Sequence, residues 1–360
     1  MPDGANQIIA DAVTRHAVDL LRLEAGERRK ITGILRELER DLVATLQRID
    51  PTGVSDRFRP ARLNKLLEQV RGTIRASYRD ASQTLARELM ELADIEAQFI
   101  TRAINNGVGF GLATNDLTRE QLRSIGRGVL VQGSPVSDWW GDQAGQTLRT
   151  FTREMRMGIA SGETNAQLVR RIRGGTENGE AVRGFMQVSR NHAEALVRSA
   201  TQAVASEAKN EVYKANADIL KGVAWSATLD NRTTVECGAR DGLLYDAVTH
   251  EPIGHNLPWG GGPGNLHWGC RSTSYPVTKS FRELGLNIDE VPPGTRASMD
   301  GQLPQDTRFE DWLERQSKTR QEEVLGAGRA ELWRDGKISF RDLLDQNGRE
   351  LTLEELRARI

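Results

Sequence analysis

The sequence predicts a mainly α protein, with an elongated helical arm and a helical stem that carry a small α+β knob, followed by a C-terminal docking tail. Two observations support this fold class. Apolar residues recur at helical spacing over most of the first two regions, and the alternation typical of a strand starts only near Val223. We therefore expect four regions: the arm at 1–115, the stem at 116–220, the knob at 221–280 and the tail at 281–360.

Length and charge set the outer limits of this interpretation. A chain of 360 residues exceeds the usual domain size of about 100–200 residues, so two or three packed units are expected. The 49 basic and 50 acidic residues give a net charge of −1, which predicts no bulk attraction to DNA or membranes. Nucleic-acid contact would then need a local patch or an oligomer. Two cysteines are too few for a disulfide framework and favour a reducing compartment.

The N-terminal sequence does not resemble a targeting segment. It begins Met1-Pro2-Asp3-Gly4 and has neither the basic nor the apolar part of a signal peptide. No apolar run approaches the roughly 20 residues that span a bilayer. The sequence therefore predicts a soluble protein without a membrane partner.

The arm is predicted to consist of two long amphipathic helices. Apolar residues keep helical spacing over 9–46 and again over 63–99, with a turn at 50–53 between them. Such stripes are typical of a helix hairpin or coiled-coil packing. His16 lies on the apolar stripe, so we expect a packed histidine with a hydrogen-bond partner.

The stem continues the helical pattern. Thr164 and Gln167 form a capping box that begins a helix, and Gly174 is expected to end it. A long helix over 190–216 carries a stripe of small residues, which allow close approach of neighbouring helices. This helix is predicted to be central.

The tail begins with a loop from Val291 to Pro304 and continues with short helical elements around Trp312, Leu325, Trp333 and Leu343. Its apolar residues are too few for a large independent core. We therefore expect the tail to dock on something else.

The knob carries the most informative motif of the chain, since it holds both cysteines and three of the five histidines. In order, the motif reads Trp225, Leu229-Asp230, Arg232-Thr233, Cys237, Asp241-Gly242, His267-Trp268-Gly269-Cys270-Arg271 and Pro276-Val277. This order resembles that of the phage Mu F-like minor head proteins. The resemblance extends to 158–172 upstream and to short motifs between 309 and 356 downstream, so it covers the C-terminal half to two-thirds of the chain.

This resemblance implies a function. It implies a minor head, or head morphogenesis, protein of a tailed phage or prophage that acts in head assembly, DNA packaging or genome delivery. The implied partners are the portal, the major capsid protein and the packaged DNA, and the protein would be present in several copies. The implied location is the virion head, with the host cytoplasm during assembly. Such a protein would not be an enzyme.

A metal site is one interpretation of the knob. Cys237, His267 and Cys270 are soft ligands, and the H-x-x-C spacing lets one turn present two of them to zinc. The fourth ligand stays open among Asp230, Asp241, His250 and His255. Two positions depart from the family pattern, because Thr234 and Ser272 stand where many relatives have cysteine. A structural zinc therefore competes with buried, reduced thiols and a histidine that bonds to the backbone.

Catalysis is the alternative function class. Cys237, His267 and a nearby aspartate would act as nucleophile, base and orienting group of a cysteine hydrolase, or the knob would be a metal-dependent hydrolase on a helical stalk. The segment His250–His255 does not fit the H-E-x-x-H motif, because its second histidine falls one place late and Pro252 would disrupt the helix. The run Gly260–Gly264 lacks a phosphate-binding lysine and is predicted to be a flexible, exposed loop.

Overall fold

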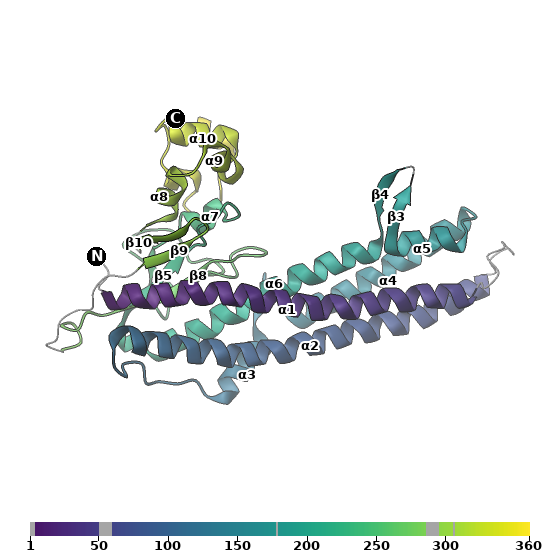
Figure 1. Cartoon of the computed structure of the whole chain (residues 1–360), viewed down its shortest axis with the longest axis horizontal. Coiled ribbons are helices and arrows are strands. Elements are labelled where there is room, and N and C mark those ends of the chain that lie inside the picture. Colours follow the sequence, from purple (N-terminus) through teal and green to yellow (C-terminus); the bar gives the residue numbers. More distant parts are fainter. Residues whose placement is uncertain (1–3, 50–59, 178, 286–294, 305–306) are drawn as a thin grey trace. The chain divides into compact units, whose positions relative to one another are not determined.

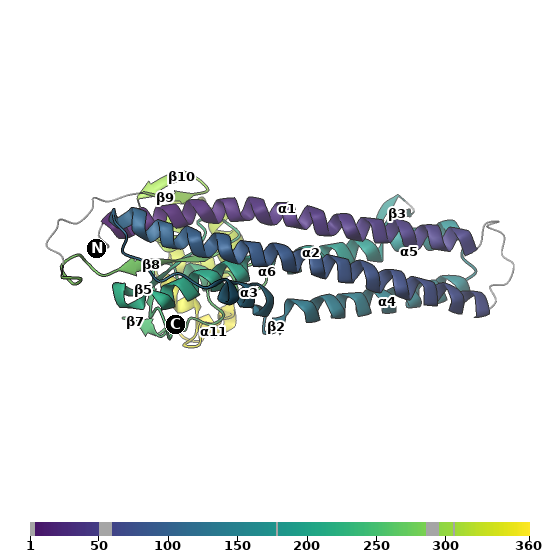
Figure 2. The same cartoon turned by 90° about the horizontal axis from the view of Figure 1, so that it is seen from below.

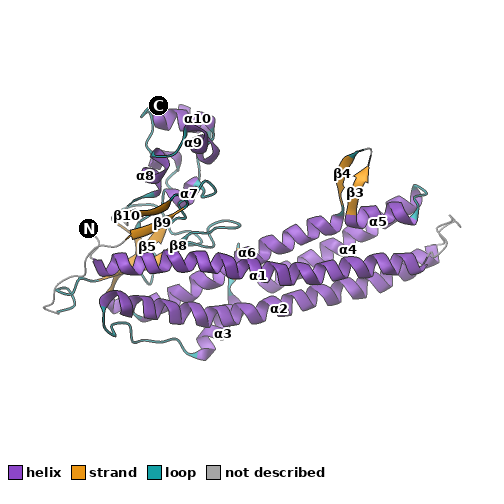
Figure 3. Ribbon diagram, in the orientation of Figure 1, coloured by secondary structure: helices purple, strands orange, loops and turns teal. Residues whose placement is uncertain are grey.

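A computed structural model describes residues 4–49, 60–177, 179–285, 295–304 and 307–360. Helices dominate these residues, and the strands form only small sheets (Figure 3). The prediction of a mainly α fold with a small α+β part is confirmed. The predicted turn at 50–53 and the first four residues of the predicted loop at 291–304 lie outside the described residues. In the rest of that segment, 295–298 and 301–304 pair as two antiparallel strands, so the prediction of a loop is wrong there.

The first two-thirds of the chain form long helices, as the periodicity predicts. These are α1 Gly4–Ile49, α2 Pro60–Val108, α3 Arg119–Gly128, α4 Val136–Ala160, α5 Asn165–Arg173 and α6 Phe185–Ala215. The predicted capping box is confirmed, because the Thr164 side chain accepts from the Gln167 amide at the start of α5. Gly174, with φ +84°, ends this helix as expected.

The chain divides into two compact units. Unit 1 comprises Met1–Arg22, Glu91–Ile125 and Gln202–Ile360, and unit 2 comprises Leu23–Met90 and Gly126–Thr201. Parts of the predicted arm and stem therefore belong to each unit, whereas the knob and the tail belong to unit 1.

Unit 2 is a helical bundle. Its segments of α1 and α2 run side by side in opposite directions (Figures 1 and 2), and Lys30 Nζ bonds to Glu88 Oε1 across them at 2.8 Å. Leu35 and Leu85 are fully buried in this packing. The Tyr78 hydroxyl lies 2.8 Å from Thr147 Oγ1 and thereby ties α2 to α4. The apolar stripes of the sequence therefore bury against each other, as a helix hairpin requires.

Unit 2 also contains two short hairpins that the helical interpretation of the stem missed. They pair β1 Leu130–Val131 with β2 Ser134–Pro135, and β3 Gly174–Glu177 with β4 Glu180–Arg183. Gly179, with φ +85°, lies in the connection between β3 and β4. Strands of two to four residues are too short to show a two-residue period, and all of β4 is exposed, so no apolar pattern marks it.

Unit 1 is built on a four-stranded sheet with the order β7-β6-β5-β8. The strands are β5 Leu220–Ser226, β6 Leu244–Tyr245, β7 Pro252–Ile253 and β8 Thr273–Thr278, and all neighbours are antiparallel. The sequence predicts one buried face for β5, yet Ala224 and Ser226 on the other face are buried as well. A helix contributes to this burial, since the Tyr213 hydroxyl of α6 donates to the Ser274 carbonyl of β8 at 3.0 Å.

The tail packs on the knob within unit 1. Its elements are β9 Thr295–Ser298, β10 Gly301–Pro304, α8 Phe309–Glu314, α9 Lys318–Leu325, α10 Ala327–Arg334, the 3₁₀ helix η2 Phe340–Leu343 and α11 Leu353–Arg357. Phe309 and Trp312 share one buried apolar cluster with the knob residues Leu229, Val235 and Leu257. The apolar side of the tail is therefore covered by its own chain.

Candidate metal centre

Two local turns position the three predicted ligands. Cys237 lies on the short helix α7 Val235–Gly238, and the Thr234 side chain caps this helix by accepting from the Cys237 amide at 3.3 Å. His267 and Cys270 precede β8, and the Cys270 amide donates to the His267 carbonyl at 3.1 Å. The H-x-x-C spacing therefore forms a turn that presents both side chains on one side.

The structure brings Cys237, His267 and Cys270 together. The two sulfur atoms lie 3.6 Å apart, and Cys237 Sγ lies 3.3 Å from His267 Nε2. All three potential ligand atoms lie within 4.8 Å of one another. Cys237 is 2% exposed and Cys270 is fully buried, so the cluster is closed to bulk solvent on the sulfur side.

This geometry fits a small tetrahedral metal site. Two thiolates that bind zinc at about 2.3 Å in a tetrahedron stand about 3.7 Å apart, close to the separation of the two sulfurs here. His267 Nδ1 lies 3.1 Å from the Trp268 carbonyl. When Nδ1 donates to this carbonyl, the other ring nitrogen, Nε2, carries a lone pair that faces the sulfurs. The donor set, two thiols and one imidazole nitrogen, is the one zinc prefers in structural sites.

The electrostatics of the cluster separate the two thiols. The hydrogen bond with Cys237 and the neighbouring His267 hold the pKa of Cys270 well below its usual range. The same bond with Cys270, together with burial, raises the pKa of Cys237. The hydrogen bond with Cys270 also raises the pKa of His267. Of the two thiols, Cys270 is therefore the one that loses its proton more readily to a metal.

None of the four candidates for the fourth ligand joins the cluster. Asp230 binds Arg271, Asp241 accepts from the Ala227 and Phe309 amides, His255 bonds to the Leu244 carbonyl and His250 stacks on Trp259. Among the described His, Cys, Asp and Glu side chains, the group contains three members. The three residues singled out from the sequence therefore lie together, whereas none of the four candidates for a fourth ligand lies with them.

Two hydroxyl residues, Thr234 and Ser272, flank the cluster. Thr234 Oγ1 lies 3.1 Å from His267 Nε2, and the Ser272 side chain bonds to Cys237 and lowers its pKa slightly against the larger opposing effects. Sequence reasoning treats these residues only as departures from a pattern. Their spacing, T-x-x-C before and C-x-S after, is the signal that places them beside the ligands.

Specific polar contacts fix the backbone around the cluster. Asp230 and Arg271 form a bidentate ion pair, in which the two terminal guanidinium nitrogens lie 2.5 and 2.6 Å from the two carboxylate oxygens. Arg240, 2% exposed, donates to the Pro258 and Glu236 carbonyls. The Asp230–Arg271 pair and the Arg240–Pro258 bond join residues that are 41 and 18 positions apart, so these side chains hold separate loops of the knob together.

The glycine-rich run is exposed only in part: Gly260 and Gly261 are exposed as expected, but the expectation of an exposed loop is wrong for the rest of the run. Gly262, Pro263 and Gly264 are buried. Gly264 has φ +83°, and a Cβ there would lie 2.8 Å from the Gln202 carbonyl of α6. Glycine at this position therefore permits both a left-handed turn and close contact with the helix.

The same geometry argues against a hydrolytic thiol. Cys237 does lie within reach of His267, yet it is buried and the neighbouring thiol raises its pKa. A nucleophilic cysteine needs an accessible thiolate. The cluster is therefore better suited to holding segments together than to attacking a substrate.

Comparison with known proteins gives one match. The family model described as Phage Mu protein F like protein matches residues 149–275, a segment that starts within α4, ends within β8 and includes the whole Cys–His cluster. No curated protein and no solved structure matches the chain significantly. Among the described helices, none combines the length and the apolar character that a membrane crossing requires.

Proposed function

We propose that the chain is a minor head protein of a tailed phage or prophage, because the family model described as Phage Mu protein F like protein matches residues 149–275. In this proposal it binds the portal or the inner capsid in several copies and acts in head assembly, DNA packaging or genome delivery. Its work is interaction rather than catalysis. It would be found in the virion head, and in the host cytoplasm while heads assemble.

The family match carries this proposal, and its position adds weight. The family indicates a phage head morphogenesis protein and is a family of structural head proteins. The matched segment joins helical and knob residues rather than an isolated motif. The burial of both thiols supports the same conclusion, because buried thiols suit a clamp better than a catalytic centre.

We further propose that Cys237, His267 and Cys270 bind one zinc ion that clamps the knob. Cys237 and His267 lie 30 positions apart, and the segment between them contains only two two-residue strands, β6 and β7. A metal that fixes the two ends of this segment would reduce the conformations open to the unfolded chain. Thr234, whose hydroxyl already contacts His267 Nε2, is the nearest candidate to complete the coordination. A site with only two thiolates should bind zinc more weakly than a four-thiolate site.

Co-purification tests the head role. The full chain, expressed with the portal protein of the same phage, is expected to co-elute with the portal rings in a fixed ratio. The major capsid protein serves as the second bait and distinguishes the two implied partners. A chain that elutes alone in both experiments would contradict the proposed interactions.

Elemental analysis tests the zinc clamp on protein purified without chelator. One zinc per chain is expected, with loss of the metal in Cys270→Ser. Ser272→Cys is the matched gain-of-ligand variant and is expected to slow removal of zinc by a chelator. Protein that contains no zinc and gains no stability when zinc is added would show that the thiols hold the knob by packing alone.

A further inference from the structure

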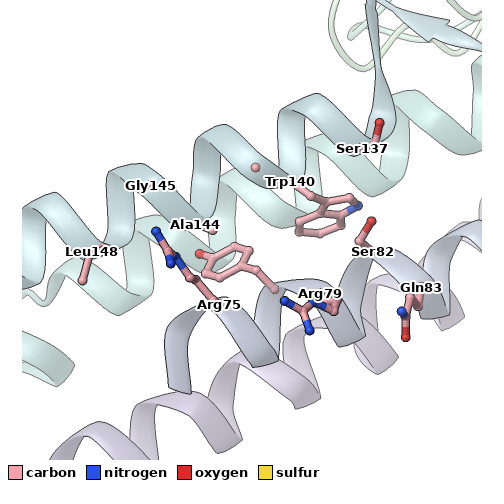
Figure 4. A pocket seen from close by; sticks show the side chains of 11 residues that line it. Arg75, Arg79, Ser82, Gln83, Ser137, Trp140, Ala144, Gly145 and Leu148 are labelled. Atoms are coloured by element: carbon pink, nitrogen blue, oxygen red, sulfur yellow. The ribbon is translucent and has the colours of Figure 1, made fainter. Parts of the chain in front are cut away.

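Unit 2 contains a pocket between α2 and α4 that shares no residue with the Cys–His cluster (Figure 4). Its volume is about 520 Å³. The residues that line it include two arginines and no acidic side chain. A pocket with this lining is electrostatically suited to an anion.

Two arginines of α2 give the pocket its positive charge. Arg75 and Arg79 lie one turn apart on α2, both are exposed, and within the part of the chain that the structure describes neither forms an ion pair. Like charges at this spacing repel each other on a helix. A bound anion would remove this repulsion, and guanidinium groups bind oxyanions through paired N–H donors.

The pocket also contains a buried hydrogen-bond donor, the indole N–H of Trp140. Trp140 lines the same pocket and is 2% exposed, and its Nε1 has no hydrogen-bond partner among the described residues. Figure 4 shows Arg75 and Ser82 pointing from α2 toward α4, with the indole of Trp140 facing them from α4. Buried N–H groups are rarely left without an acceptor. An oxygen atom of a ligand in the pocket would supply one.

The remaining polar lining also donates. Ser82 contributes a hydroxyl and Gln83 an amide group, whereas the Ser137 hydroxyl donates to Asp138 Oδ1 at 3.2 Å. Ser137 lies in the first turn of α4, whose N-cap Pro135 makes no side-chain capping bond. The positive end of this helix dipole therefore lies at one end of the pocket. Gly141 lines the same wall, and no atom would contact a Cβ at this residue, so there is open space beside it.

We infer that this pocket binds a phosphate oxyanion. A carboxylate has two oxygens on one side, whereas donors here come from both helices and suit a tetrahedral group. The volume exceeds that of an inorganic phosphate ion and leaves room for a phosphodiester with its sugars. The phosphate is therefore either free or part of a nucleic-acid backbone, and the pocket is the local basic patch that a chain of net charge −1 needs for such contact. The inference does not depend on portal binding.

The test uses the full chain and two probes, inorganic phosphate and a fluorescent 20-base-pair DNA duplex. Calorimetry measures phosphate binding at constant ionic strength against sodium chloride, and anisotropy measures duplex binding. The pocket variant is Arg75→Gln with Arg79→Gln. The control is Arg71→Gln with Arg87→Gln, which removes the same charge from the same helix outside the pocket. Trp140→Phe removes the indole N–H and keeps a buried ring.

The pocket variant is expected to lose at least about tenfold in phosphate affinity, and the control less than about twofold. Trp140→Phe is expected to lose about threefold to tenfold without a change in melting temperature. This last result separates ligand binding from a structural role.

The two phosphate sources give different results. The phosphate belongs to a nucleic acid if three results hold together. The duplex binds, phosphate competes with it, and the slope of duplex affinity against salt concentration falls by about two in the pocket variant. If phosphate binds and the duplex does not, the ligand is free phosphate. Absence of phosphate binding, or an equal loss in the pocket and control variants, would overturn the inference.

Discussion

The helical unit 2 and the knob of unit 1 are stabilised in different ways. In unit 2, side chains such as Leu35, Leu38 and Leu85 repeat at helical spacing and are fully buried, so many similar contacts share the stabilisation. The knob has strands of two to seven residues, and single polar side chains such as Asp241 and Arg271 join its loops. Unit 2 should therefore respond to changes of volume and charge in its core, and the knob to changes of single polar groups, pH and metal.

The largest effect is expected in the core of unit 2. Leu85→Asp should cost at least about 4 kcal/mol, because removal of a buried leucine side chain alone costs about 2–5 kcal/mol and an unpaired carboxylate adds to this. Thermal unfolding followed by circular dichroism measures the change. The control Leu85→Met preserves volume and should cost less than about 1.5 kcal/mol. Similar melting temperatures for both variants would show that this face is not a core.

A smaller and local effect is expected for Asp241→Ala. Its carboxylate accepts from the Ala227 and Phe309 amides, both at 2.8 Å, and leaving two buried amides unpaired costs about 2–5 kcal/mol. Hydrogen exchange should rise in the knob and the tail and stay unchanged in unit 2. Asp246→Ala is the matched control, since its bonds to the Val248 and Thr249 amides are solvent-exposed. Equal exchange in both variants would contradict the distinction between the two regions.

The smallest effect concerns pH. Burial is the largest single effect on the pKa of Asp230 and would raise it, but the bond and charge of Arg271, together with the Arg232 amide and the Thr233 hydroxyl, outweigh it and lower the pKa below the usual 3.8. A depressed pKa means that the ion pair stabilises the knob fully above about pH 5 and loses this contribution as the pH falls through the folded-state pKa. Asp230→Asn should abolish this part of the acid dependence. An unchanged acid transition in the variant would show that the ion pair adds nothing.

The same difference explains what the sequence could predict. The helices follow from apolar spacing and from local caps such as Thr164 with Gln167, because both signals lie within a few residues. The packed histidine is confirmed too, since His16 Nε2 lies 2.7 Å from Glu96 Oε1 and its ring stacks on Phe99. The sequence singles out Cys237, His267 and Cys270 because each lies in a short motif: Cys237 follows Arg232-Thr233, and His267 and Cys270 share one H-x-x-C motif.

The missed features depend on contacts between distant residues. The glycine run reads as flexible, and only the Gln202 carbonyl of α6 shows why it is packed. Leu229 shares a core with Phe309, which no local pattern indicates. The pocket with Arg75 and Trp140 arises because two helices meet, so neither helix predicts it alone. The spacing of apolar residues therefore predicts helices and strands, whereas contacts between residues distant in sequence determine which loops are packed and where pockets form.

The central claim is that the chain is a component of the phage head, and quantitative mass spectrometry of purified heads tests it most directly. Heads are freed of unassembled protein by two density gradients, and peptides of this chain are quantified against the portal and the major capsid protein. We expect several copies of the chain per head, in a constant ratio to the portal protein. Heads that lack the chain, while the infected or induced cells contain it, would contradict the account.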